Sequence, residues 1–578
     1  MASSRRGVLI IILVLVLVVC VSAVSLFLLT VTAGAPPTVP SEAALYLKLN
    51  GPWDEVARMD LFSQLGEPSP TLRELIASIR RAKRDARVKT LVITPSVEGA
   101  LWAQIQELRA AIDDFRSAGK PVVAYLEAGG PQEYYLASAA NKIILMPAGA
   151  IDLSGLATYE LFFRGALDKI GVYPDLLHIG DYKTASNTFT EKGFTTAHKE
   201  MSKSLNSDWF GQLVTGIAEG RKRPEAEVRK LIDSGPYLAE EAKNAGLVDV
   251  LGYEDQIDKA PPVQGTTKMD GDAYERATNF GGAFASNRIA LLYAVGTIAS
   301  GKSSFDSPGA TVLGSDTFDQ WVRKVRVDPS VRAIVVRIDS PGGSAIASDA
   351  IWRELMLARD VKPVIVSMGD VAASGGYYMA VPAHVIVAEP GTITGSIGVV
   401  TGKFVVKDTL EKLGIGVDSV SDGRLAEINS PFKPFSKDER ARIESQLQST
   451  YELFLSRVAE GRHLTTAKVD TMAQGRVWTG HQAKDLGLVD ELGGLDTALQ
   501  IAKQRAKIDP KSEVELVVYP AKRSLFEVLS NPLGRNADSG LSVLARPRDA
   551  RIVDAALAML RLFRRGEPLT LMPNVFVN

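Results

Sequence analysis

The chain has 578 residues, of which 66 are Lys or Arg and 67 are Asp or Glu, so its formal net charge is -1. Hydrophobic residues make up 46% and charged residues 23%, which is typical of globular domains and excludes a disordered or fibrous protein. The balanced charge argues against a nucleic-acid partner. A single cysteine and five histidines exclude a disulfide framework and a cysteine-built zinc site, and we expect neither a metal nor another cofactor.

A long uncharged segment follows the N-terminus. Residues 8–31 are nearly continuous Val, Leu and Ile, and as a helix they would extend about 36 Å, enough to cross a hydrocarbon core of about 30 Å. Arg5 and Arg6 precede this segment, and the first charge after it is Glu42, so the positive-inside rule keeps the N-terminus in the cytoplasm. The sequence therefore predicts a single transmembrane helix.

The same segment has an alternative interpretation as a cleaved signal peptide, with small residues for cleavage at 33–35. The apolar run is longer than an ordinary signal-peptide core, which favours a membrane span. We expect a cytoplasmic N-terminus at 1–7, the span at 8–31 and a linker at 32–42.

Beyond the linker, short β-branched segments alternate with helical patterns. Strands are predicted at 43–49, 90–94, 121–127 and 142–147. Between the second and third, apolar residues recur at helical spacing, at Leu101, Ile105, Leu108, Ile112 and Phe115. Alternating strands and helices predict an α/β fold with a mainly parallel sheet.

The same order of elements returns from residue 287, with matching residues. Asp85 to Val88 matches Asp328 to Val331, and Tyr134 to Ala137 matches Tyr377 to Ala380, in each case 243 positions later. The sequence thus predicts a tandem duplication, with repeats at 43–286 and 287–505. Residues 506–578 form a C-terminal extension whose role the sequence does not indicate.

Comparison of the repeats points to one composite site. The second repeat has a glycine pair at Gly342 and Gly343 and a Ser374-Gly375-Gly376 turn after a strand, whereas the first repeat has no glycine pair at the position that corresponds to Gly342 and carries Pro131 at the serine position. Ser374 is a candidate nucleophile, and the amides of Gly342 and Gly375 are candidate oxyanion donors. A serine in a glycine-rich turn is also an ordinary turn or cap residue, so this pattern alone is a weak indication.

The candidate serine needs a base, and none of the five histidines has a convincing position. A lysine can serve if burial lowers its pKa. Lys183 of the first repeat is the best candidate, because its counterpart in the second repeat is Arg424, which cannot be deprotonated. We therefore expect the second repeat to supply the serine and the first repeat to supply the base.

The chain resembles the signal peptide peptidase A, or protease IV, family in its long, duplicated bacterial form. The motifs that carry the resemblance are DSPGGS (339–344), MGDVAASGGYY (368–378), TGSIGV (394–399), VWTGHQAKDLGLVD (477–490) and GDYKTA (180–185). Asp370 departs from the small residue found in many members, and we expect little consequence.

This resemblance implies that Ser374 is the nucleophile, Lys183 the general base and Ser396 a residue that orients the lysine. It further implies tandem ClpP/crotonase-like domains, a bowl-shaped homotetramer and hydrophobic peptide substrates such as cleaved signal peptides. Together with the predicted span, it implies an enzyme of the bacterial inner membrane whose catalytic domains lie on the periplasmic side.

Three alternatives remain at this point. Gly296 to Ser303 matches a phosphate-binding loop, although a loop rather than a helix is expected after it. The residues around Ser374 also resemble a hydrolase nucleophile elbow, which would need a positioned histidine. Finally, the chain could be a catalytically inactive membrane-anchored scaffold that only binds peptides.

Overall fold

The computed structural model describes residues 15–17, 20–22, 24, 37–57, 70–278, 287–304, 311–521, 568–572 and 576–577. The predicted membrane span at 8–31 lies for the most part outside these residues. Within the part of the chain that the structure describes, no helix is both long and apolar enough to cross a membrane.

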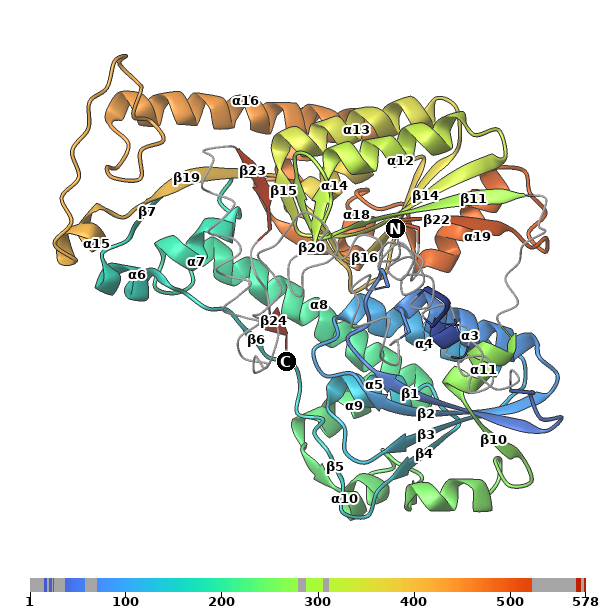
Figure 1. The fold of residues 1–578 in the computed structure, drawn as a ribbon. Helices are drawn as coiled ribbons and strands as arrows, with labels where there is room; N and C mark the ends of the chain where they lie inside the picture. The colour runs from blue at the N-terminus through green and yellow to red at the C-terminus, as the bar shows by residue number, and fades with distance from the viewer. Residues whose placement is uncertain are drawn as a thin grey trace, which may run out of the picture.

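The first half is built on a six-stranded sheet whose strand pairs are all parallel (Figure 1). Its order is β10-β1-β2-β3-β4-β9, with β10 at Thr267–Asp270, β1 at Ala43–Asn50, β2 at Val88–Ser96, β3 at Val122–Leu126, β4 at Lys142–Leu145 and β9 at Val250–Leu251. The four strands expected from the sequence and the helix between the second and third, α4 (Trp102–Ser117), are therefore confirmed.

The second half repeats this architecture. Its main sheet follows the order β20-β18-β16-β14-β11-β22, and β17 and β21 extend it from β16. The bounds are Val477–Thr479 for β20, Ile393–Gly395 for β18, Val364–Ala373 for β16, Val331–Ser340 for β14, Arg288–Val295 for β11, Glu515–Tyr519 for β22, Val385–Ala388 for β17 and Glu491–Leu492 for β21. Because β22 joins this sheet, the strands of the second half continue beyond residue 505.

Helices cover both sheets (Figure 1). In the first half, α3 (Leu72–Arg84) and α4 lie on the side facing the second half, and α3 begins with a capping box between Thr71 and Glu74. In the second half, α12 (Ser315–Val327) and α13 (Ala345–Arg359) cover one face of the sheet and α19 (Leu495–Arg505) covers the other. Each half also has a 26-residue helix, α8 (Thr196–Arg221) and α16 (Lys437–Arg462).

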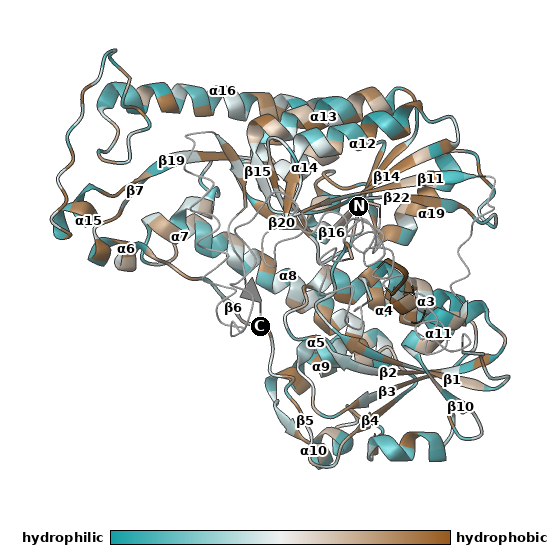
Figure 2. Ribbon diagram, in the orientation of Figure 1, coloured by the Kyte–Doolittle hydropathy of each residue, from teal (hydrophilic) through white to brown (hydrophobic). Residues whose placement is uncertain are grey.

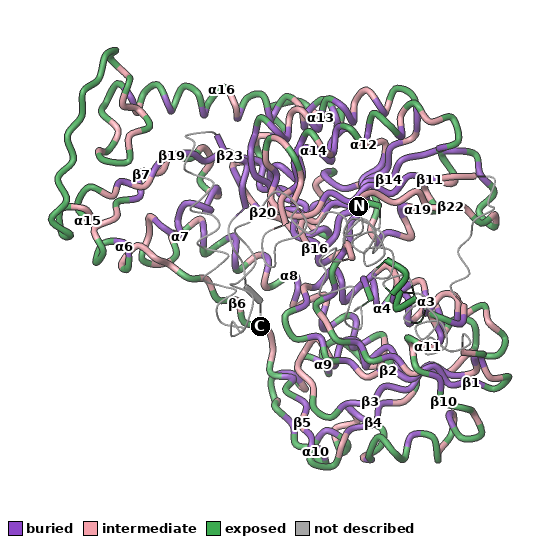
Figure 3. The backbone as a smooth tube through the Cα atoms, in the orientation of Figure 1, coloured by how far each residue is buried: buried purple, intermediate pink, exposed green. Residues whose placement is uncertain are grey.

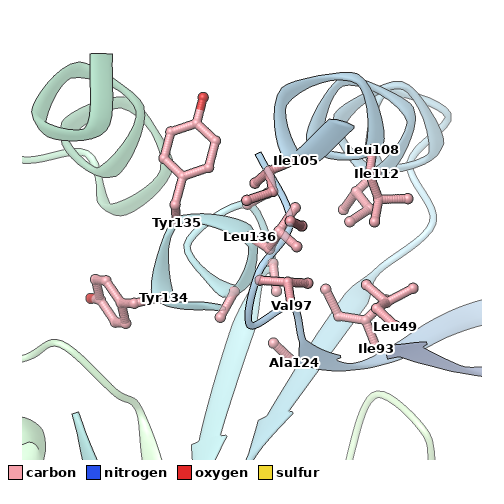
Figure 4. Close-up of a cluster of buried hydrophobic side chains, with 14 of the residues drawn as sticks. Leu49, Ile93, Val97, Ile105, Leu108, Ile112, Ala124, Tyr134, Tyr135 and Leu136 are labelled. Atoms are coloured by element: carbon pink, nitrogen blue, oxygen red, sulfur yellow. The ribbon is translucent and has the colours of Figure 1, made fainter. Parts of the chain in front are cut away.

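Apolar residues concentrate on the strands of both sheets (Figure 2), and the same segments are buried (Figure 3). The core of the first half packs one face of its sheet against α4 and α5 (Pro131–Ala137), with Ile93 and Ala124 on the sheet and Ile105, Leu108 and Leu136 on the helices (Figure 4). The predicted apolar face of the helix therefore forms part of this core.

A third sheet joins the two halves. Its order is β13-β12-β15-β23-β19-β7, and β7 (Tyr173–Ile179) is its one strand from the first half. The remaining strands are β13 (Val312–Gly314), β12 (Thr297–Ala299), β15 (Gly342–Ser344), β19 (Val399–Val405) and β23 (Leu569–Leu571). β7 and β19 form an arm that extends from the body of the molecule together with α6 (Arg164–Ile170) and α15 (Lys407–Lys412) (Figure 1).

A buried ionic cluster also connects the halves. Arg337 on β14 is 1% exposed and donates hydrogen bonds to Glu55 and Glu107, both from the first half. Asp370, for which we expected little consequence, is buried and accepts a hydrogen bond from the backbone N–H of Gln104 at 3.0 Å. This aspartate therefore has a structural partner across the interface between the halves.

Candidate active site

Ser374 occupies a strained turn between a strand and a helix. It follows β16 directly and precedes α14 (Gly375–Ala380), and its backbone has φ 54° and ψ -111°. A non-glycine residue at positive φ is energetically costly, and such residues are concentrated at functional sites. The neighbouring structure fixes the turn, because the N–H of Ser374 donates to the carbonyl of Gly395 and the N–H of Tyr378 donates to the carbonyl of Ser374, each at 2.8 Å.

Lys183 reaches this turn through the pairing of β7 with β19. The two strands are antiparallel, with Ile179 opposite Val399. Lys183 lies four residues after Ile179, and Ser396 lies three residues before Val399, so the strand register brings both residues to the same end of the arm. The crossing of one strand between the halves therefore delivers the lysine to the serine-bearing half.

The side chain of Lys183 has three oxygen neighbours. Its Nζ lies 2.7 Å from Ser374 Oγ, 2.9 Å from the carbonyl oxygen of Ser396 and 3.0 Å from Ser396 Oγ. All three residues are completely buried. A neutral amine has two hydrogens and one lone pair, so it can donate to both Ser396 oxygens and present its lone pair to the Ser374 hydroxyl.

Burial lowers the pKa of Lys183 well below its ordinary value. The cause is desolvation, which disfavours the ammonium form relative to the neutral amine. No carboxylate is among the hydrogen-bond partners named above, so the local contacts do not offset this effect. The site therefore has the electrostatic character required to hold an uncharged amine beside a hydroxyl.

Gly475 makes room for the lysine backbone. A Cβ at this glycine would come within 2.5 Å of the Lys183 N, Cα and Cβ atoms, and its φ of +76° also favours glycine. The adjacent backbone is fixed by the N–H of Gly475, which donates to the carbonyl of Ile397 at 2.8 Å, and by that of Tyr182, which donates to Gln474 at 3.0 Å. The segment around Gly475 thus determines where Lys183 sits, a role the sequence did not suggest.

The two glycines expected to bind an oxyanion lie next to each other. A Cβ on Gly342 would be 2.8 Å from the nitrogen of Gly375, and a Cβ on Gly375 would be 3.2 Å from the Cα of Gly342. The N–H of Gly342 donates to Ser340 Oγ at 3.2 Å. The glycines are therefore brought together as expected, while the use of the Gly342 amide as an oxyanion donor stays a prediction.

The histidines are occupied elsewhere. His198 pairs with Glu160 at 2.6 Å, His481 with Asp208 at 3.0 Å, and His178 lies 3.0 Å from the carbonyl of Gly180. His384 accepts a hydrogen bond from the N–H of Val364, and His463 ends α16 with φ 55°. These contacts do not provide the positioned histidine that a hydrolase nucleophile elbow requires.

The sequence match to a phosphate-binding loop does not have the required structure. β12 ends at Ala299, Lys302 and Ser303 lie in irregular structure, and the next helix in the described chain, α12, begins at Ser315. A phosphate loop needs a helix that starts at the Lys-Ser pair. Among the described residues, no group of three or more His, Cys, Asp or Glu is arranged to hold a metal ion.

A segment next to the site lies in the C-terminal extension, whose role the sequence does not indicate. Residues 568–572 are buried, and β23 within them pairs with β15, the strand that contains Gly342. Their sequence, PLTLM, is too short to carry a recognisable pattern, and they lie far along the chain from both repeats. Only tertiary structure reveals their position.

Several curated proteins that are similar to this chain are named as proteases. "Serine protease SPPA, chloroplastic" of Arabidopsis thaliana is 34% identical over 80% of this chain and 69% of its own length. "Protease 4" of Salmonella typhi is 36% identical over 76% of this chain and 72% of its own length. "Protease 4" of Haemophilus influenzae is 34% identical over 80% of this chain and 79% of its own length.

Among solved structures, a mutant of the 1510-N membrane-bound stomatin-specific protease covers 41% of this chain and all of its own, with 16% identity and a TM-score of 0.26. A ClpP1 mutant from Listeria monocytogenes covers 36% of this chain and 92% of its own, with 14% identity and a TM-score of 0.23.

The model of peptidase family S49 matches residues 114–261 and 357–509, one region in each half of the chain. The fold is thus α/β with two S49 domains, in agreement with the duplication predicted from the sequence. The chain belongs to peptidase family S49 and is a serine protease homologous to protease IV.

Proposed function

We propose that the protein is a membrane-anchored serine endopeptidase with a Ser374–Lys183 dyad that degrades hydrophobic peptides. The observation that carries the assignment is the 2.7 Å separation of Lys183 Nζ and Ser374 Oγ in a fully buried site. This distance is within the reach that general-base catalysis requires.

In the proposed mechanism, neutral Lys183 accepts the hydroxyl proton of Ser374 as Oγ attacks the peptide carbonyl. The protonated lysine then gives its proton to the leaving amine, and water releases the acyl group with Lys183 again as base. Ser396 keeps the amine in position through its two oxygens. The amides of Gly342 and Gly375 are proposed to bind the oxyanion.

The substrate class and cellular setting are part of the same proposal. Resemblance to protease IV supports hydrophobic peptides such as cleaved signal peptides, two ClpP/crotonase-like domains and a homotetramer. The apolar sequence at 8–31, with Arg5 and Arg6 before it, supports an anchor in the bacterial inner membrane and catalytic domains on the periplasmic side. An enzyme anchored in this way acts where such peptides are released.

A reactive probe tests the dyad and separates an enzyme from an inactive scaffold. A small β-lactone should acylate the chain once, at Ser374, and the adduct should be located by peptide mass spectrometry. Ser374→Ala should abolish labelling, whereas the exposed Ser330→Ala variant should be labelled normally. Labelling that persists at full yield in Ser374→Ala, or normal peptide turnover by that variant, would overturn the assignment.

A further inference from the structure

The C-terminal segment Pro568–Met572 fills the centre of the third sheet. β23 lies between β15 and β19 and is antiparallel to both, with Gly343 opposite Thr570 and Val400 opposite Leu569. The pairing continues at both ends of β23. The N–H of Met572 donates to the carbonyl of Pro341, and the N–H of Ala345 donates to the carbonyl of Pro568. The other strands of this sheet lie between residues 173 and 405, so β15 and β19 are joined only by a strand from the far end of the chain.

This strand lies against the two glycines that are proposed to bind the oxyanion. The Thr570 carbonyl oxygen would be 2.0 Å from a Cβ on Gly342, and Thr570 Oγ1 would be 2.7 Å from a Cβ on Gly375. Thr570 Oγ1 also donates to the carbonyl of Gly343 at 3.2 Å. Thus the side chain of Thr570 lies beside Gly375, the residue that follows Ser374, and the carbonyl of Thr570 lies beside Gly342.

The side chains of the segment alternate as those of a bound extended peptide would. Leu569 and Leu571 are each 2% exposed and pack in a cluster with Leu167, Phe189 and Val400. Thr570 is completely buried and faces Gly375 instead. Successive side chains of a strand point to opposite faces. The two leucines therefore pack in the apolar cluster, and Thr570 between them faces Gly375.

We propose that Pro568–Met572 occupies the substrate strand of the active site and acts as an intramolecular competitor of peptide substrates. This inference rests on the proposed function of Ser374 and Lys183. The backbone groups of Gly342–Ser344 that face β23 can pair with only one strand, so a substrate peptide has to displace the segment. The segment also indicates the preferred ligand: an extended peptide with aliphatic residues on both sides of a small one.

Hydrogen exchange on the intact protein tests the displacement. One sample carries the small β-lactone adduct at Ser374, and a second carries the same β-lactone linked to an extended Leu-rich pentapeptide. In the pentapeptide adduct, the amides of residues 569–572 should exchange about tenfold faster or more than in the unlabelled protein. In the small adduct, their exchange rates should stay unchanged. Amides of β22, which are remote from Ser374, serve as the internal control.

The outcomes separate the two proposals. Absence of any adduct contradicts the Ser374 assignment itself. A complete pentapeptide adduct with unchanged protection at 569–572 overturns the competitor proposal and leaves the protease assignment standing, because the segment is then a permanent part of the fold.

Kinetics of a tail variant provide an independent measurement. Thr570→Pro removes the N–H of the residue opposite Gly343 and should weaken β23, lowering KM for an apolar peptide by about tenfold with little change in kcat. Thr570→Ser keeps both the N–H and the hydroxyl that donates to the Gly343 carbonyl and is the matched control, with KM near that of the unaltered chain. A synthetic peptide of residues 566–574 should inhibit Thr570→Pro competitively.

If Thr570→Pro instead raises KM or lowers kcat, the segment builds the site rather than blocks it, and the proposal is wrong. Noncompetitive inhibition by the synthetic peptide would contradict it equally.

Discussion

The two halves share a scaffold and differ in chemistry. Tyr134 donates to the carbonyl of Leu247 in the first half, and its counterpart Tyr377 donates to Leu488 in the second, both at 2.8 Å. At the turn before each tyrosine, however, the first half has a proline at the start of α5, and the second half has Ser374 with a strained backbone. Duplication has therefore preserved the contacts that hold each half together, while the reactive turn is present in only one.

The same contrast applies to the base. Lys183 is completely buried beside Ser396, whereas its counterpart Arg424 lies on an exposed loop and pairs with Asp438, with 72% of its side chain exposed. A buried lysine can lose its proton, but a solvated arginine cannot. Each half thus carries only one of the two proposed catalytic residues, and the proposed active site depends on the contact between the halves.

The largest expected effect comes from removing the base. Lys183→Met keeps the length of the side chain and should lower kcat/KM by about 10⁴–10⁶-fold, as expected for loss of a group that acts with a nucleophile. The matched change in the other half, Arg424→Met, should leave kcat/KM within about twofold. Comparable activity of the two variants in a peptide-cleavage assay would show that the halves do not differ in the way described.

Lys183→Met should also raise the free energy of unfolding at neutral pH, by on the order of 1 kcal/mol. The pKa of Lys183 is lowered in the folded chain. At neutral pH the amine therefore has to lose its proton when the chain folds, and this loss costs free energy. Stability of the unaltered chain should accordingly rise with pH between the lowered folded-state pKa and the ordinary lysine pKa, where only the unfolded chain holds the proton. The acidic limb of kcat/KM should report the same lysine. Chemical denaturation at several pH values checks the first expectation, and unaltered pH dependence in Lys183→Met would contradict it.

The next effect concerns the interface that unites the halves. Burial acts to lower the pKa of Arg337, but Glu107 and Glu55 outweigh burial and raise it well above its ordinary value. Arg337→Met leaves two buried carboxylates without their cation and should cost about 3–5 kcal/mol of unfolding free energy. Arg323→Met, which removes a 55% exposed partner of Glu354, should cost less than about 1 kcal/mol in the same denaturation experiment. Equal costs would show that the cluster does not stabilise the interface.

A smaller effect is expected from moving the lysine without removing it. Gly475→Ala places a methyl group against the Lys183 backbone and should lower kcat by about 10²-fold. Gly487 is the matched control, because it has the same φ of +76° but open space where a Cβ would lie. Both variants share the cost of a left-handed alanine, so a loss of kcat in Gly487→Ala as large as in Gly475→Ala would attribute the effect to backbone strain.

The last effect is a change in the pH dependence of stability. Burial, followed by repulsion from Glu107, raises the pKa of Glu389 to about 8, and the corresponding residue of the first half is Met146. The folded chain therefore holds a proton that the unfolded chain has released, and stability should fall as pH rises from about 4.5 to 8, by at most about 1.4 kcal/mol per pH unit. Glu389→Gln should flatten this slope in urea titrations. A slope identical to that of the unaltered chain would locate the proton elsewhere.

The sequence was sufficient to predict much of this arrangement. The β-branched segments and the apolar helix at 101–115 are local patterns, and the structure confirms them as β1 to β4 and α4. The contact between Lys183 and Ser374 could be anticipated because the two repeats have lost different residues. It follows from comparing the halves, not from any local pattern.

Other features depend on tertiary contacts and leave no local signal. The role of Gly475 beside Lys183 follows from strand crossing, because glycine in a loop has many possible causes. Asp370 was expected to matter little, yet it meets Gln104 across the halves. The segment at 568–572 pairs with residues more than 160 positions away, and its three-residue strand gives no indication of its partner.

The proposed nucleophile and base are 191 positions apart in the chain. A ribosome therefore completes the lysine-bearing half before it reaches the serine, and neither a nascent chain shorter than 374 residues nor a fragment cut between the halves contains both groups. Peptide-bond cleavage begins only when the second half has folded against the first. A site divided in this way between two repeats would leave an unfinished chain without proteolytic activity.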